Sequence, residues 1–244
     1  MEVCPQNNWE SYNFRAESGP AFVSFFAEAK DILQEEYPDC ARVLIRIKNP
    51  GPSGGPTKEE AEILWAMEDS IVAALEKSSV KCVLLARITY NGRRELVFQV
   101  HDWDTFRPPL GSWMEAHSDY ETDASEQEGW TFFLESIWPS REDWQCIFDR
   151  RVVDNLKKAG SNPTREHTLE FVFRGEIEPL NEIMRALLMR SYWVVKLSPE
   201  EQMLIIAKNL PLDLALITRE SLSHLKEADR LEIVYDGWGC LVVK

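Results

Sequence analysis

The chain has 244 residues and a formal net charge of -14, and its 44% hydrophobic and 28% charged residues are typical of a globular protein. Its apolar runs stay far below the roughly 20 residues that a membrane-spanning helix needs, and its N-terminus lacks the features of a secretory signal, so we expect a cytoplasmic protein. The acidity disfavours direct binding to nucleic acids or to anionic membranes.

Three short strands are predicted near the N-terminus. Trp9 to Arg15 and Ala21 to Phe26 are aromatic-rich runs on either side of a Ser-Gly-Pro turn, and Ala41 to Lys48 alternates apolar with basic residues. The Pro- and Gly-rich segment 49–56 that follows is a loop. It lacks the residue pattern of a phosphate-binding loop, and its prolines remove amides that would hold an anion, so nucleotide binding is not expected there.

A helix follows this loop. Thr57 and Glu60 have the spacing of a capping box, which marks the helix start. Apolar residues at helical spacing, Trp65 among them, then predict a buried stripe that extends to Leu75. We interpret Trp65 as a core residue.

The next two strands form a predicted hairpin, because Asn91-Gly92 between Lys81 to Tyr90 and Arg93 to His101 is a strong turn signal. The second strand ends in the best catalytic candidate of the chain, His101-Asp102-Trp103-Asp104, since a histidine beside carboxylates suits acid–base or metal chemistry. Adjacent strand residues point to opposite faces, however, and no second ligand lies at a metal-site spacing. A structural strand exit is therefore the favoured interpretation.

An acidic segment follows. Pro108 to Ser140 has no Lys or Arg, and among its acids Glu121, Asp123 and Glu126 are candidate contacts for a basic protein partner. The alternative interpretation is a solvated loop that confers solubility. Within this segment, Gly129 to Trp138 is aromatic and β-rich.

A helix is predicted after Pro139. Ser140 caps it with Asp143 at the third helical position, and Gly160-Ser161-Asn162-Pro163 ends it. Its expected buried face consists of apolar residues at helical spacing: Trp144, Ile147, Phe148, Val152 and Leu156.

The remaining chain has a β-α-β-β-α-β order. The predicted elements are strand Thr168 to Arg174, helix Glu176 to Arg190, strands Tyr192 to Leu197 and Met203 to Asn209, helix Thr218 to Asp229, and Leu231 to Tyr235 with Cys240 to Val243 as a final strand pair or bulged strand. Ser198-Pro199-Glu200-Glu201 also fits a short helix. The order indicates a ferredoxin-like sandwich.

These elements predict an α+β protein of two α/β sandwich units, an acidic domain at 1–145 and a ferredoxin-like domain at 146–244. The acidity lies in the first, where 26 acids against 13 bases give -13, while 15 against 14 give -1 in the second. The five cysteines (Cys4, Cys40, Cys82, Cys146 and Cys240) are scattered with no C-x-x-C pair, which is typical of buried thiols in a reducing compartment. No metal or cofactor is expected.

Two stretches of the second unit carry a family resemblance. Leu156 to Pro163 and Leu225 to Gly239, which ends in Tyr235-Asp236-Gly237-Trp238-Gly239, resemble the bacterial regulator of ribonuclease activity B family. The resemblance implies a ferredoxin-like core and a non-enzymatic protein that binds ribonuclease E and lowers RNA turnover. The first unit resembles an uncharacterised bacterial domain that is often joined to that regulator. Unlike the acidic family pattern, the second unit here is near neutral.

We therefore expect a non-enzymatic, protein-binding regulator that modulates ribonuclease E-type RNA decay. Tyr235, Asp236 and Trp238 are candidate protein-binding residues, although the glycines, Trp238 and Asp236 also fit a packing device at a bend. The alternative from another class is an enzyme or small-molecule binder that uses an inter-domain cleft near His101. A third is a purely structural pairing of sheets into a dimer. The oligomeric state is not predicted.

Overall fold

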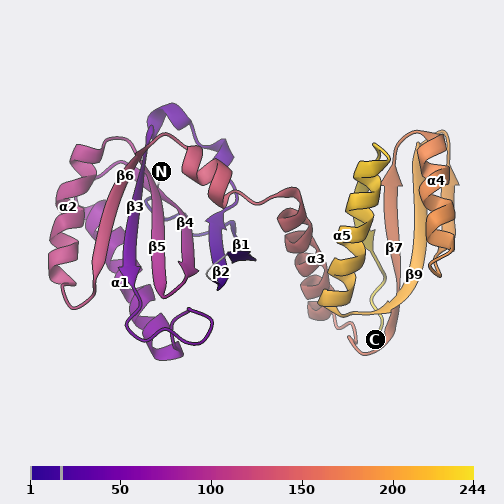
Figure 1. Ribbon diagram of the computed structural model, residues 1–244, viewed down its shortest axis with the longest axis horizontal. Coiled ribbons are helices and arrows are strands. Elements are labelled where there is room, and N and C mark those ends of the chain that lie inside the picture. Colours follow the sequence, from indigo (N-terminus) through magenta and orange to yellow (C-terminus); the bar gives the residue numbers. More distant parts are fainter. Residues whose placement is uncertain (1, 17–18) are drawn as a thin grey trace. The chain divides into compact units, whose positions relative to one another are not determined.

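The computed structural model describes residues 2–16 and 19–244, which form two compact units, Met1–Trp138 and Pro139–Lys244 (Figure 1). Each unit contains its own sheet and its own helices. The sequence-based boundary after Gln145 falls inside a helix that the structure groups as a whole with the second unit. The predicted α+β class is confirmed.

The first unit is built on a six-stranded antiparallel sheet with the order β1-β2-β4-β5-β3-β6. Its strands are β1 (Trp9–Ala16), β2 (Gly19–Phe26), β3 (Asp39–Arg46), β4 (Cys82–Tyr90), β5 (Arg93–Val100) and β6 (Thr122–Glu128). The predicted hairpin is confirmed, and both residues of its Asn91-Gly92 turn have positive φ. Strand β6 lies at one edge of the sheet.

Two helices, α1 (Lys58–Lys77) and α2 (Trp103–Ala116), pack with the sheet around one apolar core. The members of this core include Leu64 and Ile71 of α1, Phe106 of α2 and Phe98 of β5, all with no exposed surface. Short 3₁₀ turns lie at Ala29–Asp31 and Gln34–Glu36. Burying this apolar face holds the sheet and helices together.

The start of α1 differs in detail from the expected capping box. The Thr57 side chain accepts the Glu60 backbone N–H as predicted. The buried Glu60 carboxylate, however, does not return the bond to Thr57; it accepts the backbone N–H groups of Lys48 at 2.6 Å and Asn49 at 2.8 Å. Glu60 thus ties the start of the loop after β3 to α1.

Trp65 is not a core residue, so that expectation was wrong. Its side chain is 45% exposed, and its ring lies near the guanidinium groups of Arg87 and Arg94, at 5.4 and 4.6 Å from the ring centroid. The buried stripe of α1 uses Leu64, Met67, Ile71 and Leu75 instead. An indole at the edge of a stripe is stabilised by cation–π contacts there rather than by burial.

The acidic segment from Pro108 to Ser140, for which a solvated loop was the alternative interpretation, contains regular structure. Helix α2 occupies its start, β6 its middle, and a π-helical turn spans Phe133–Ile137, where β structure had been predicted. Phe133 and Ile137 are fully buried, and the Tyr12 hydroxyl donates to the Ile137 carbonyl at 2.5 Å. The aromatic run therefore forms a helical turn whose apolar side chains are buried.

The second unit is a four-stranded antiparallel sheet with the order β10-β7-β9-β8. Its elements are α3 (Arg141–Lys158), β7 (Glu166–Arg174), α4 (Ile177–Leu188), β8 (Trp193–Ser198), β9 (Met203–Pro211), α5 (Leu214–Arg230) and β10 (Val234–Gly239). From β7 onward this is the predicted β-α-β-β-α-β order, with the fourth strand beside the first and the third between the first and second. The ferredoxin-like connectivity is thereby confirmed.

Helix α3 precedes this core and packs against α5 (Figure 1). Its predicted start is confirmed as a complete capping box between Ser140 and Asp143, and Gly160 follows its end with a φ of 89°. The buried face differs from the expected one. It follows Gln145, Asp149, Val153 and Leu156 along one side of the helix, and Ile147 is buried on a different side. The expected core residue Phe148 is 47% exposed.

Three smaller expectations for this unit change. Helix α5 begins at Leu214, four residues before the predicted start, because the Asp213 side chain caps it by accepting the Leu216 N–H at 3.0 Å. Residues 199–202 form a turn, not a short helix. Cys240 to Val243 is irregular, because β10 already ends at Gly239.

Candidate functional site: a pocket between α3 and β10

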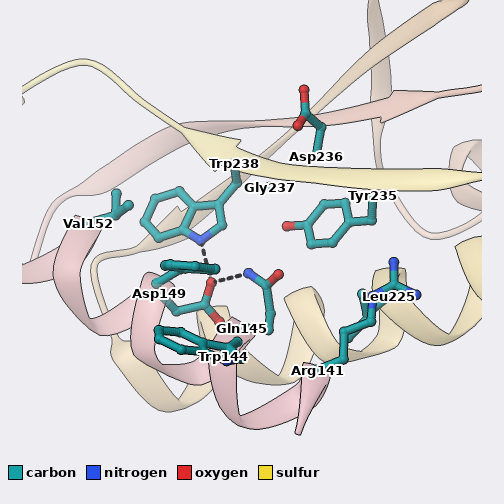
Figure 2. A pocket seen from close by; sticks show the side chains of 11 residues that line it. Arg141, Trp144, Gln145, Asp149, Val152, Leu225, Tyr235, Asp236, Gly237 and Trp238 are labelled. Atoms are coloured by element: carbon teal, nitrogen blue, oxygen red, sulfur yellow. Dashed lines mark hydrogen bonds between the residues drawn. The ribbon is translucent and has the colours of Figure 1, made fainter. Parts of the chain in front are cut away.

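A pocket of about 380 Å³ lies between α3 and β10 of the second unit (Figure 2). One wall comes from the first half of α3 and the other from the Tyr235-Asp236-Gly237-Trp238 segment. The lining residues are Arg141, Trp144, Gln145, Phe148, Asp149, Val152, Leu225, Tyr235, Asp236, Gly237 and Trp238. The three C-terminal residues proposed from the sequence as protein-binding are therefore at one pocket.

A β-bulge in β10 determines how these residues point. Tyr235 pairs with Phe173 of β7, while Gly237 pairs with Val172, so Asp236 is the extra residue of the bulge. Side chains alternate along a regular strand, so Tyr235 and Trp238 would point to opposite faces without it. The bulge places both on the helix-covered side, and it requires the φ of 97° that Gly237 adopts.

Asp236 points to the other side of β10 from the Trp238 indole (Figure 2). Its carboxylate forms an ion pair with Arg174 at 2.7 Å, and both side chains are about half exposed. Exposed pairs of this kind contribute little to stability, of the order of 1 kcal/mol or less. Asp236 therefore belongs to the rim of the pocket, where its charge is already paired.

Trp238 is bound to a buried carboxylate on α3. Its indole N–H donates to Asp149 Oδ1 at 2.8 Å, and the same oxygen accepts the Gln145 amide at 2.8 Å (Figure 2). This oxygen also accepts the Ser221 hydroxyl at 3.0 Å. Asp149 has no exposed surface. Burial raises the pKa of its carboxyl, and these hydrogen bonds oppose the rise.

Tyr235 lies deeper than Trp238. It is 5% exposed, its hydroxyl is 3.3 Å from the Ser221 hydroxyl, and its ring contacts those of Phe173 and His224. Trp238 by contrast keeps part of its surface exposed. Of the two aromatic residues, Tyr235 belongs mainly to the core and Trp238 is the one that reaches the pocket surface.

Two aromatic residues of α3 complete the pocket wall. Trp144 and Phe148 are stacked, with ring centroids 5.5 Å apart and an interplanar angle of 25°. The sequence prediction placed both in the core, but Phe148 is about half exposed and Trp144 is only partly buried. An aromatic surface of this kind is enriched at protein interfaces.

The acidic candidates lie in the first unit and not in the lining of this pocket. Glu121 precedes β6 and pairs with Arg46 at 2.9 Å across an exposed surface. Asp123 and Glu126 lie on β6 and are exposed, and Asp123 accepts the N–H of Ala124 at 2.9 Å. Strand β6 pairs only with β3, so these acids line a sheet edge.

The His101 segment has structural roles. His101 is exposed, and its Nδ1 lies 2.9 Å from the Glu36 carbonyl, to which it donates. Asp102 caps α2 by accepting the Asp104 N–H at 3.1 Å, and Asp104 is exposed in the first turn. The segment is thus the start of a helix, and its side chains bond to backbone groups rather than to one another.

Within residues 2–16 and 19–244, no three His, Cys, Asp or Glu side chains gather as a metal-binding group. The five cysteines are free thiols, and burial raises the pKa of Cys40 and Cys82 to about 12, as expected for unreactive core thiols. No helix in the described part of the chain is both long and apolar enough to cross a bilayer.

Fold and pocket define an α+β protein of two units, the second a ferredoxin-like domain with a bulged terminal strand. Residues 7–137, more than half of the chain, match the family of unknown function DUF695, and the chain belongs to that family. Residues 147–240 match the family Regulator of ribonuclease activity B, so the predicted fusion of an uncharacterised domain to a regulator domain is confirmed.

No curated protein matches the chain. A crystal structure of an unknown protein from Galdieria sulphuraria aligns with 84% of this chain and 99% of its own at 11% identity. The TM-score of 0.22 is too low to indicate a shared fold.

The sequence pointed to Tyr235, Asp236 and Trp238 but missed their partners on α3. Asp149 and Gln145 are polar residues four positions apart on an otherwise apolar helix face. That spacing was the available signal, because a buried polar residue on a helix needs a hydrogen-bond partner.

Proposed function

We propose that this chain is a non-enzymatic regulator that binds an endoribonuclease of the ribonuclease E type through its second unit and lowers RNA cleavage. The observation that carries the proposal is the match of residues 147–240 to Regulator of ribonuclease activity B. The matched residues contain eight of the eleven residues that line the α3–β10 pocket, and the other three, Arg141, Trp144 and Gln145, lie just before the match. The matched segment and the pocket thus largely overlap.

The chemistry of the pocket supports a protein ligand. Binding energy in protein interfaces concentrates in a few aromatic and arginine contacts. Trp238, Trp144 and Phe148 supply aromatic surface beside paired charges at the rim, Arg141 with Asp229 and Asp236 with Arg174. A segment of the ribonuclease would cover these rings.

The first unit supports a second contact of the same partner. We propose that the acidic edge strand β6, with Asp123 and Glu126 exposed and Glu121 before it, attracts a basic segment. Such an attraction weakens as salt rises, because the charges are exposed. Reversal of Asp123 and Glu126 to lysine should lower the association rate and flatten its salt dependence.

The test uses the full chain and purified ribonuclease E. We expect the ribonuclease to be enriched in a pull-down from bacterial extract and RNA cleavage to slow on addition of the protein. Phe148→Ala should weaken both effects about tenfold or more, as loss of an interface aromatic costs roughly 2 kcal/mol. Met189→Ala is the matched control, since Met189 is 88% exposed in the same unit but lies outside the pocket.

Absence of any ribonuclease or associated protein from the pull-down, together with unchanged RNA cleavage, would overturn the proposal. Equal weakening by Phe148→Ala and Met189→Ala would remove the pocket as the binding surface.

A further inference from the structure

The two carboxylate oxygens of Asp149, at the base of the pocket, differ in their hydrogen bonds. Asp149 Oδ1 accepts three side-chain hydrogen bonds, from Trp238, Gln145 and Ser221. The other oxygen, Oδ2, is buried and has no hydrogen-bond partner of good geometry among the described residues, although the Thr218 hydroxyl lies close enough to the carboxyl to lower its pKa. A buried acceptor without a donor is costly, about 1–3 kcal/mol and more when it is charged. Such an atom in a pocket wall points to a ligand that supplies the donor.

Asp149 also lacks a counter-charge. The other charged residues of the lining, Arg141 and Asp236, pair with Asp229 and Arg174. No described cation forms an ion pair with Asp149. When it is ionised, Asp149 is an uncompensated negative charge in a buried position, and a cation that enters the pocket would relieve the cost of burying that charge.

The walls of the pocket are flat and aromatic. Trp238 on β10 and the Trp144–Phe148 stack on α3 are part of the lining. A guanidinium is planar, stacks on aromatic rings and is weakly hydrated, whereas an ammonium is a strongly hydrated point charge. A guanidinium also has several N–H donors for a carboxylate oxygen.

We infer that this pocket binds the side chain of an arginine from a protein partner, with the guanidinium donating to Asp149 Oδ2 and stacking on the aromatic walls. Because Oδ2 has almost no exposed surface in the empty pocket, a side chain of the lining has to change rotamer when the guanidinium binds. The inference rests on the proposed function in requiring a protein partner, and it adds the chemistry by which that partner is recognised.

The test follows the indole N–H signals of the tryptophans in nitrogen-15 NMR spectra of the full chain. The probe is N-acetyl-arginine amide, and the comparison is N-acetyl-citrulline amide, which has nearly the same shape and no charge. We expect a saturable shift of the Trp238 signal with the arginine probe and at least tenfold weaker binding of the citrulline probe. Equal binding of both probes, or no saturable shift with arginine, would overturn the inference.

Asp149→Asn gives an independent test. Asparagine keeps one oxygen as acceptor for Trp238, Gln145 and Ser221 but replaces Oδ2 with an NH₂ group, which repels a guanidinium. This variant should lose the arginine-dependent shift, while Asp154→Asn, which alters an exposed carboxylate of α3 outside the pocket lining, should keep it within about threefold. The comparison of the two probes on the unchanged protein stands even where Asp149→Asn fails to fold.

The outcomes also separate this inference from the proposed function. If the protein inhibits the ribonuclease but does not bind the arginine probe, the proposed function is supported and the arginine-binding pocket is refuted. If the protein binds the arginine probe saturably but leaves RNA cleavage unchanged, the arginine-binding pocket is supported and the proposed function is refuted.

Discussion

Replacement of His224 is expected to change how the stability of the second unit depends on pH. His224 is 1% exposed, and its Nε2 lies 3.1 Å from the Tyr192 hydroxyl, which itself donates to Glu220 at 2.5 Å. Since that hydroxyl hydrogen is already used, Nε2 must be the donor to Tyr192. Nδ1 then carries no hydrogen, and it is buried without a partner among the described residues. The structure thus holds His224 in its neutral form.

Protonation would place an N–H with no acceptor at Nδ1, among the rings of Phe171, Phe173 and Tyr235. Burial lowers the pKa of His224 from 6.5 to about 4, and the nearby Glu220 carboxylate only partly opposes this. Between these two values the unfolded chain binds more protons than the folded one. His224 therefore contributes stability that is full above pH 6.5 and is lost as the pH falls toward 4, at most roughly 3 kcal/mol.

The assay compares the unchanged protein with His224→Gln, which keeps an N–H donor for Tyr192 and does not titrate in this range. Urea unfolding is followed by pulsed hydrogen exchange at the amides of β7 and α5, so that the readout belongs to the second unit. We expect the unchanged protein to lose about 2 kcal/mol more than the variant between pH 6.5 and 4.5. Glu220 acts mainly below this window, because its pKa is lowered from 4.5. Equal losses in the two proteins would refute the reasoning.

Two further predictions concern the bulge and the start of α1. Gly237→Ala should destabilise the second unit by about 1–2 kcal/mol in urea unfolding, because φ is 97° there although no atom lies within 4 Å of an added Cβ. Gly239→Ala, also unhindered but without a positive φ, should be nearly neutral, and equal effects would exclude backbone strain as the cause. Glu60→Gln should cost the first unit about 1–2 kcal/mol, because one of the two backbone amides that the buried Glu60 side chain binds loses its acceptor. The control is Glu59→Gln, since Glu59 is exposed. Equal losses of unfolding free energy in the two variants would contradict the role of Glu60.

The second unit was predictable from sequence in its element order because its helices and strands have local signals. Helix α3 begins at a capping box and ends before a glycine, and the apolar positions of α4 repeat with helical spacing. Such signals need only a few neighbouring residues. The confirmed ferredoxin-like topology therefore follows from contacts within short stretches of chain.

Helix α2 was missed because Pro108 and Pro109 lie inside it, and prolines normally interrupt a helix. They deprive the carbonyls of Asp104 and Thr105 of intrahelical donors. Those two residues are exposed, so water satisfies the carbonyls. Phe106, Leu110 and Trp113 are buried at helical spacing on the other side. Burial of this face outweighs the two missing bonds, which is a balance set by tertiary packing and not by local sequence.

The pocket shows why a motif can be located while its chemistry is not. Two glycines around Trp238 indicated a bend, but the face on which Trp238 lies depends on the register with β7, which local sequence does not contain. Asp149 receives hydrogen bonds from residues 89 and 72 positions away, Trp238 and Ser221. A carboxylate that these residues bury is indistinguishable, in the sequence of α3, from one that faces water. The Asp149 carboxylate is buried, and its Oδ2 is left without a hydrogen-bond partner, only because α5 and β10 pack on α3. This burial is the physical reason to expect arginine recognition by the pocket.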